Sequence, residues 1–130
     1  MTIVLASLLI AVLIPYVLAG LAGRYKAQQF GKADNNNPRL QSAQLTGAGA
    51  RAVAAQQNAW EALAVFTASL VAAFLGGVEP TSLTVPALLF VAARVAHAIC
   101  YIRDLATPRS LVFGIGTLAC LWIFVKAFAA

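Results

Sequence analysis

Charged residues are scarce in this sequence, and their scarcity excludes most water-soluble folds. Only 10% of the 130 residues are charged, whereas 62% are hydrophobic. A soluble domain of this size has about a quarter of its residues charged, because charged side chains cover the surface that water solvates. We therefore expect lipid to be the solvent for much of the chain. Its length allows a single domain, residues 1–130.

Acidic residues are the scarcer of the two charged kinds. Nine Lys and Arg stand against four Asp and Glu, which gives a formal charge of +5. Such an excess can indicate nucleic-acid binding, but that function needs a basic patch on a soluble face. Here the basic residues lie mostly in two loops between apolar segments, so anionic lipid headgroups and membrane topology explain them better. We expect no nucleic-acid partner.

Cysteine is also rare, and its pattern excludes the usual frameworks. Cys100 and Cys120 lie inside apolar segments at different depths, which makes a disulfide between them geometrically unfavourable. Neither has the CxxC spacing of a metal or redox site. We expect both to be small buried hydrophobic side chains, and we expect no metal.

Long apolar runs are what the sequence has in abundance. Four segments could cross a membrane: residues 3–22, 49–75, 83–103 and 109–128. Runs of about 20 apolar residues match a hydrocarbon core of about 30 Å. The first run is too long for a signal peptide and lacks a basic segment before it, so we expect it to be a membrane helix. The prediction is an all-α membrane protein, a four-transmembrane-helix bundle, with residues 24–46 as a polar loop.

Polar residues in two of these segments recur at helical spacing. The second segment carries Arg51, Asn58 and Glu61, spaced by seven and three residues. The third carries His97 three residues after Arg94, and Tyr101 four residues later. Spacings of three, four and seven place side chains on one face of a helix. Each segment is therefore predicted to present one polar stripe.

Two charged residues of these stripes are expected at matching depths. Glu61 lies ten residues in from Arg51, and Arg94 lies nine residues in from Arg103. At 1.5 Å per residue, both would lie about 14–15 Å from the cytoplasmic edge. An unpaired charge there costs several kcal/mol, so we predict a structural ion pair between Glu61 and Arg94. Asn58, His97 and Tyr101 could equally serve as interhelical hydrogen-bonding or interfacial side chains.

Three short motifs stand out: Asn58-x-x-Glu61 followed by Phe66, Arg94-Val-Ala-His97-x-x-x-Tyr101, and Pro108-Arg109-Ser110. These motifs resemble those of the MAPEG family, the membrane-associated proteins of eicosanoid and glutathione metabolism. The third-segment string is particularly similar to that of microsomal prostaglandin E synthase. The residues that follow Tyr101 look like the uncharacterised bacterial branch. The resemblance extends over essentially the whole chain.

The resemblance implies a homotrimer in the bacterial inner membrane, with glutathione bound between subunits near the cytoplasmic side. Arg109 would be the catalytic residue that stabilises the glutathione thiolate, since a fixed cation makes a thiol a better nucleophile. The residues that would contact glutathione or shape its pocket are Asn58, Glu61, His97, Tyr101 and Gln56.

One position departs from the family pattern. Catalytic members carry an arginine four residues before the motif asparagine, where this chain has Ala54. The spacing from Tyr101 to Arg109 also differs by one residue from the synthase pattern. Arg51 or Lys26 would then have to supply the missing charge to glutathione.

Three functions stay open on this basis. One is a glutathione-dependent transferase or peroxidase, of the microsomal glutathione S-transferase kind, acting on lipophilic small molecules that enter from the membrane lipids. Asn58, Tyr101 and Arg109 favour this function. Ala54 favours the other two, which are a non-catalytic trimer that binds lipids or another ligand and an accessory subunit of a larger membrane complex.

The distribution of basic residues predicts that both termini face the periplasm. Loops one and three together hold seven of the nine Lys and Arg, and loop two holds none. Basic loops stay in the cytoplasm. A cysteine introduced by Asn36→Cys should react with an impermeant thiol reagent only from the cytoplasmic side, and one introduced by Ser82→Cys only from the periplasmic side. Labelling of Asn36→Cys from the periplasm would contradict the predicted topology.

Overall fold

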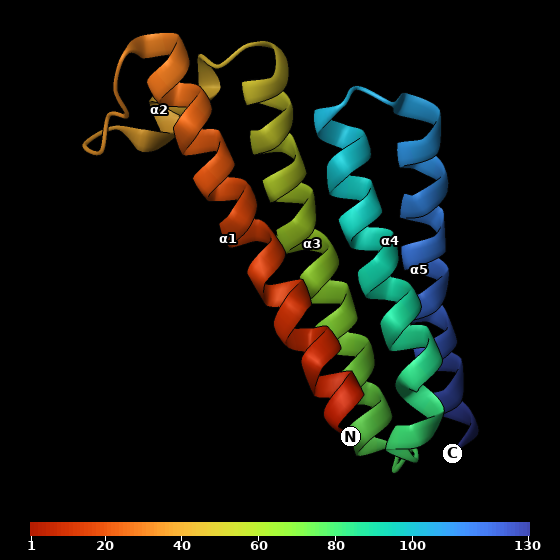
Figure 1. The fold of residues 1–130 in the computed structure, drawn as a ribbon. Coiled ribbons are helices and arrows are strands. Elements are labelled where there is room, and N and C mark those ends of the chain that lie inside the picture. Colours follow the sequence, from red (N-terminus) through yellow and green to blue (C-terminus); the bar gives the residue numbers. More distant parts are fainter.

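The computed structural model describes residues 1–130 and contains helices joined by short connections (Figure 1). The long helices are α1 (Thr2–Phe30), α3 (Gly47–Leu75), α4 (Thr84–Ile102) and α5 (Ala106–Ala129). A short helix α2 (Pro38–Ala43) and a 3₁₀ turn η1 (Pro80–Leu83) lie in two of the connections. The four long helices, α4 together with η1, are long and apolar enough to cross a membrane. The predicted fold class is confirmed.

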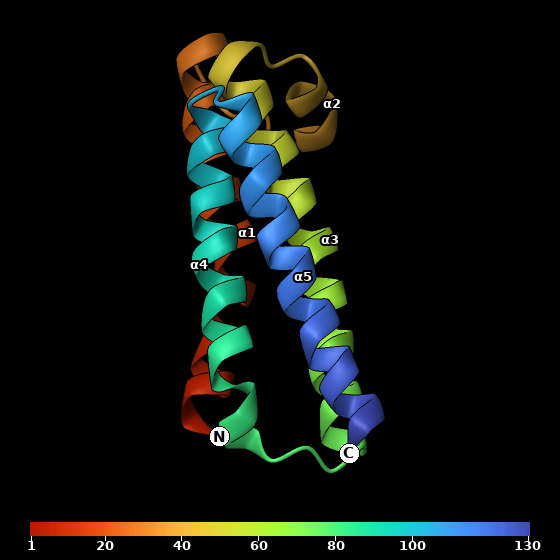
Figure 2. The same ribbon diagram turned by 90° about the vertical axis from the view of Figure 1, so that its right-hand side faces the viewer.

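Both termini lie at one end of the bundle, next to the connection from α3 to α4 (Figure 1). Residues 31–46 and the turn between α4 and α5 lie at the opposite end, which we call the loop end. α1 packs mainly against α3, and α4 packs mainly against α5. In the view turned by 90°, α1 lies behind α4 and α3 lies behind α5 (Figure 2). The bundle therefore consists of two helix pairs in contact.

Small and aromatic side chains form the core between these pairs. The rings of Phe66 and Phe90 stack with their centroids 4.0 Å apart. Near the termini, a Cβ atom at Gly76 would meet the carbonyl oxygen of Ala127 at 2.9 Å, so the close approach of α3 and α5 there requires glycine.

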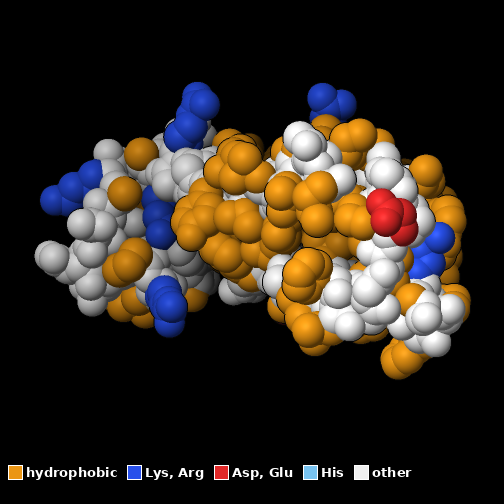
Figure 3. Space-filling view, turned by 90° about the horizontal axis from the view of Figure 1, so that it is seen from below, with side chains coloured by type: hydrophobic (Ala, Val, Ile, Leu, Met, Phe, Trp, Pro, Cys, Tyr) orange, Lys and Arg blue, Asp and Glu red, His pale blue; other side chains and the backbone are white.

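Large hydrophobic side chains cover much of the outside. They include Val17 at 70% exposed, Leu75 at 78% and Leu111 at 65%. Seen from the end that carries the termini, hydrophobic side chains gather over much of the surface (Figure 3). A lipid environment accommodates such a surface, whereas water would not.

α1 is longer than the sequence predicts. It continues beyond residue 22 to Phe30, because Ala, Lys and Gln in this stretch favour helix. Gly31, with a φ of 82°, ends it. At 1.5 Å per residue, 29 residues span about 43 Å, more than a hydrocarbon core of about 30 Å. The last turns of α1 therefore reach the depth of the lipid headgroups.

The polar loop is shorter and more ordered than predicted. The Asp34 carboxylate accepts hydrogen bonds from the backbone N–H groups of Asn37 at 3.1 Å and Asn36 at 2.9 Å. These hydrogen bonds lower the pKa of Asp34 from its usual value, and the bond from the backbone N–H of Asn37 has the largest effect. The Gln41 side chain binds the backbone N–H of Asp34 at 2.8 Å and the carbonyl oxygen of Lys32 at 2.9 Å. The network fixes α2 against the loop.

Candidate functional site

Arg94 of α4 lies buried between helices, with 4% of its surface exposed. Its Nη2 donates to Oδ1 of Asn58 at 2.6 Å and lies 3.3 Å from Nδ1 of His97. Arg94 and His97 share a face of α4 because three residues separate them. An arginine has no acceptor, so Nδ1 of His97 must accept this bond. That assignment puts the imidazole proton on Nε2.

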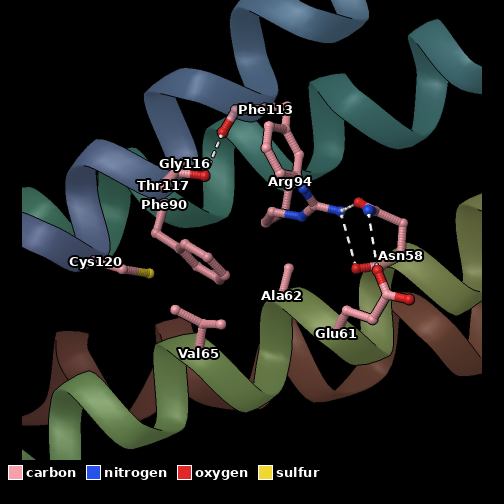
Figure 4. Close-up of a pocket in the computed structure, with 10 residues that line it drawn as sticks. All are labelled: Asn58, Glu61, Ala62, Val65, Phe90, Arg94, Phe113, Gly116, Thr117 and Cys120. Atoms are coloured by element: carbon pink, nitrogen blue, oxygen red, sulfur yellow. Dashed lines mark hydrogen bonds between the residues drawn. The ribbon is translucent and has the colours of Figure 1, made fainter.

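The direct ion pair predicted between Glu61 and Arg94 is not formed, and Asn58 lies between the two residues (Figure 4). Asn58 accepts from Arg94 through Oδ1, and its Nδ2 donates to Oε2 of Glu61 at 3.4 Å. Two side chains that are three residues apart on a helix point in directions that differ by about 60°. Asn58 therefore faces α4, whereas Glu61 points to the protomer surface and is exposed.

A cavity of about 240 Å³ adjoins this cluster, between α3, α4 and α5 (Figure 4). The Nε of Arg94 is buried there and has no hydrogen-bond partner. The cavity has a polar end at Asn58 and Arg94 and otherwise mostly apolar walls. Its lining residues are Asn58, Glu61, Ala62 and Val65 of α3, Phe90 and Arg94 of α4, and Phe113, Gly116, Thr117 and Cys120 of α5. Such a space suits a lipophilic molecule with one polar group.

Aromatic contacts extend the cluster toward the loop end of the bundle. The rings of His97 and Tyr101 pack in a T-shaped arrangement, with their centroids 5.5 Å apart. The guanidinium carbon of Arg109, at the start of α5, lies 4.4 Å from the centre of the Tyr101 ring. A cation over an aromatic face is attracted by the ring quadrupole. Contacts thus run without a break from Asn58 through Arg94, His97 and Tyr101 to Arg109.

Arg51 joins the start of α3 to the turn between α4 and α5. Its Nε donates to the carbonyl oxygen of Ile102 at 3.1 Å, and its Nη1 lies 3.7 Å from Oδ2 of Asp104. Asp104 has a φ of 61°, a left-handed conformation that aspartate tolerates better than most residues. An exposed ion pair of this kind contributes about 0–1 kcal/mol. Arg51 is therefore engaged at the turn and not beside Asn58.

Gln56 and Lys26 lie elsewhere, although the sequence placed them with the glutathione-contacting residues. They line a second cavity, between α1, α2 and α3. Two residues along a helix differ in direction by about 200°, so Gln56 and Asn58 point to nearly opposite sides of α3. The structure brings together Asn58, Glu61 and Arg94 around one cavity and places Gln56 and Lys26 at another.

The face that α5 presents to the first cavity was missed from the sequence. Phe113, Gly116, Thr117 and Cys120 recur at spacings of three and four, which is the signal of one helical face. Because apolar and small residues occur all around α5, this spacing did not distinguish the cavity face from a lipid face.

Comparison with known proteins identifies a family for the whole bundle. The model of the MAPEG family matches residues 3–129, which include all four long helices almost completely. A search of curated proteins gave no match. The family assignment therefore rests on the pattern of the whole chain.

The stability of the protein should depend on the contact between Asn58 and Arg94. A hydrogen bond to a charged group contributes about 1.5–3 kcal/mol, so Asn58→Leu should lower the free energy of unfolding by that amount. The double variant Asn58→Leu/Arg94→Leu should lose at least about 1 kcal/mol less than the two single losses combined. Denaturant titration in detergent measures these free energies.

Glu61→Gln provides the matched control for this cycle. Because Glu61 makes no ion pair with Arg94 and reaches it only through Asn58, Glu61→Gln and Arg94→Leu should be coupled less strongly than Asn58→Leu and Arg94→Leu. Strong coupling of Glu61 with Arg94, together with additive losses for Asn58 and Arg94, would contradict the observed contact and favour the direct ion pair.

Proposed function

The chain belongs to the MAPEG family, and we propose that it binds glutathione and uses its thiol against lipophilic electrophiles, as a transferase or peroxidase. The observation that carries this proposal is the unbroken line of contacts from Asn58 to Arg109 beside a mostly apolar cavity. These contacts connect Arg109, near the loop end of the bundle, with the cavity beside Asn58 and Arg94 at the depth of the hydrocarbon. A polar thiol donor and a lipophilic partner could therefore meet there.

The side chains along this line match the groups of glutathione. Glutathione carries two carboxylates, one ammonium group, amides and a thiol. Glu61, which has no cation partner in the protomer, suits the ammonium group. Asn58 and Tyr101 offer hydrogen-bonding groups for the amides. Arg109, which makes no ion pair within the protomer, is the cation for the sulfur.

Arg109 has the properties that thiolate stabilisation needs. A free thiol has a pKa of about 8.5, and a neighbouring cation favours its deprotonated, nucleophilic form. Arginine keeps its charge at any physiological pH, so it donates hydrogen bonds but cannot take up a proton. The Tyr101 ring lies 4.4 Å from the guanidinium carbon, and Arg109 is not fully buried.

Glu61 also supports assembly of several copies. Its exposed carboxylate would face lipid in an isolated protomer, and a charge at that depth costs several kcal/mol. A neighbouring subunit would cover it and complete the site. We propose a homotrimer, the number being that of the family resemblance, in a bacterial inner membrane with both termini in the periplasm.

Ala54 weakens the catalytic proposal and favours a second function. Within the protomer, Arg51 is held by Ile102 and Asp104, and Lys26 lies at the other cavity, so neither replaces an arginine at position 54 of its own chain. A missing charge-assisted hydrogen bond of about 1.5–3 kcal/mol lowers affinity about ten- to a hundred-fold. The second candidate is therefore a trimer that binds a lipophilic ligand without thiol chemistry, alone or as an accessory subunit of a larger complex.

Two variants test glutathione binding and its use. Ala54→Arg should tighten glutathione binding about ten- to a hundred-fold in calorimetry, because it restores one charge-assisted hydrogen bond. Arg109→Leu should abolish conjugation of glutathione to a lipophilic electrophile while leaving the trimer mass unchanged in native mass spectrometry.

The same measurements separate the two functions. No glutathione binding at millimolar concentration by the wild type, with none gained in Ala54→Arg, would exclude the thiol-dependent function. A stable heteromeric partner on purification would then support an accessory subunit. A monomer or dimer in mild detergent would contradict the proposed trimer.

A further inference from the structure

The turn between α4 and α5 determines where Arg109 lies. The backbone N–H of Leu105 donates to the carbonyl oxygen of Cys100 at 2.9 Å, and that of Asp104 donates to the carbonyl oxygen of Tyr101 at 3.2 Å. These two bonds form a Schellman motif, which ends α4. The backbone N–H of Arg109 then donates to the carbonyl oxygen of Leu105 at 3.1 Å. The position of Arg109 over the Tyr101 ring therefore depends on the conformation of this turn.

Asp104 occupies the position of this motif that glycine usually takes. Its φ of 61° is left-handed, and a side chain at such a φ costs free energy that glycine does not lose. Glycine or asparagine would form the same turn without a negative charge. The turn alone therefore does not explain the carboxylate at position 104.

That carboxylate meets Arg51 of α3. The Nη1 of Arg51 lies 3.7 Å from Oδ2 of Asp104, and its Nε donates to the carbonyl oxygen of Ile102 at 3.1 Å. The last four carbonyl groups of a helix have no partner within the helix, and Ile102 carries one of them. No other side chain from outside α4 and α5 forms a hydrogen bond or ion pair with this turn. Arg51 therefore caps α4 from the side and ties the turn to α3.

Arg51 shares its helix with Asn58, which lies seven residues, or about 10 Å, further along α3. α3 thus carries one end of the line of contacts from Asn58 to Arg109, and the turn between α4 and α5 carries the other end. The tie through Arg51 sets the distance between these two ends. An exposed ion pair shifts a folding equilibrium about five-fold at most, so stability alone accounts poorly for Arg51.

We propose that Arg51 is a positioning residue: it holds the turn between α4 and α5 so that the guanidinium of Arg109 stays beside the sulfur of bound glutathione. This role rests on the proposed thiol chemistry, and in it Arg51 does not touch glutathione itself. The role is sensitive to small movements. A cation that moves from about 4 Å to about 5 Å from a thiolate loses about a fifth of its attraction, which corresponds to about half a pKa unit of the thiol.

Three variants of the full-length protein test this role. Arg51→Gln removes the charge that ties the turn to α3. Asp104→Asn removes only the ion pair, because asparagine tolerates the same φ. Asp104→Gly also removes the carboxylate, but it should not lower the free energy of unfolding, because the relaxed backbone offsets the lost ion pair. A variant that keeps its stability and loses activity separates positioning from folding.

All three variants should raise the pKa of the bound glutathione thiol by about 0.5, measured from the ultraviolet absorbance of the thiolate against pH. They should lower kcat for conjugation about ten- to a hundred-fold, because displacement of a catalytic group by about 1 Å has effects of that size. The KM for glutathione should stay nearly constant. Without glutathione, hydrogen exchange of residues 103–110 should be up to about five-fold faster in Arg51→Gln.

The matched control is Arg103→Gln, which removes the same charge from the same turn. Arg103 is exposed and makes no ion pair, so this variant should match the wild type in every measurement. An equal effect in this control would show a general effect of charge and overturn the role of Arg51. Unchanged hydrogen exchange in Arg51→Gln would overturn it as well.

The remaining outcomes separate this role from the alternatives. Faster exchange in Arg51→Gln with an unchanged thiol pKa and kcat would leave Arg51 a structural role only and overturn the proposal. A higher KM with an unchanged thiol pKa would show that Arg51 contacts glutathione itself, which also overturns it. No glutathione binding by the wild type would instead overturn the proposed function, and this role with it.

Discussion

A guanidinium buried at lipid depth is the constraint on which the rest of this structure depends. Arg94 is almost fully enclosed, and a charge at that depth needs partners inside the protein. Asn58 supplies one from α3 and His97 another from one turn along α4. The first contact fixes how α3 and α4 face each other. The second orients an imidazole that packs on Tyr101, and Tyr101 in turn carries Arg109.

This arrangement gives the two sides of α3 different chemistry. The side toward α4 and α5 combines a buried cation with an apolar cavity, so it suits a lipophilic molecule with a polar group. The side toward α1 and α2 lines a second cavity, to which Lys26, Arg39, Gln56 and Gln57 contribute polar groups. A helix with polar groups on two faces cannot lie against lipid on both. α3 is therefore the element that separates two cavities.

The spans and the polar stripes could be predicted from the sequence, because run length and helical spacing are local properties. The partner of Arg94 could not, since equal depth does not say which way a side chain points. Glu61 has the right depth and the right charge, but it is turned about 60° from Asn58 and faces outward. Likewise, Gln56 is near Asn58 in sequence and opposite to it in space. The added length of α1 was missed because polar residues beyond the hydrocarbon still favour helix.

The bond between Arg94 and His97 offers the most direct test, because His97 is the one histidine in the chain. Nitrogen-15 solid-state NMR of histidine-labelled protein in lipid bilayers reports the protonation of each ring nitrogen without any need for assignment. The contact predicts a neutral imidazole with the proton on Nε2 and with Nδ1 accepting from Arg94, an acceptor shift that Arg94→Leu should remove. A proton on Nδ1 in the wild type, in either the neutral or the charged ring, would contradict the network on which this account depends.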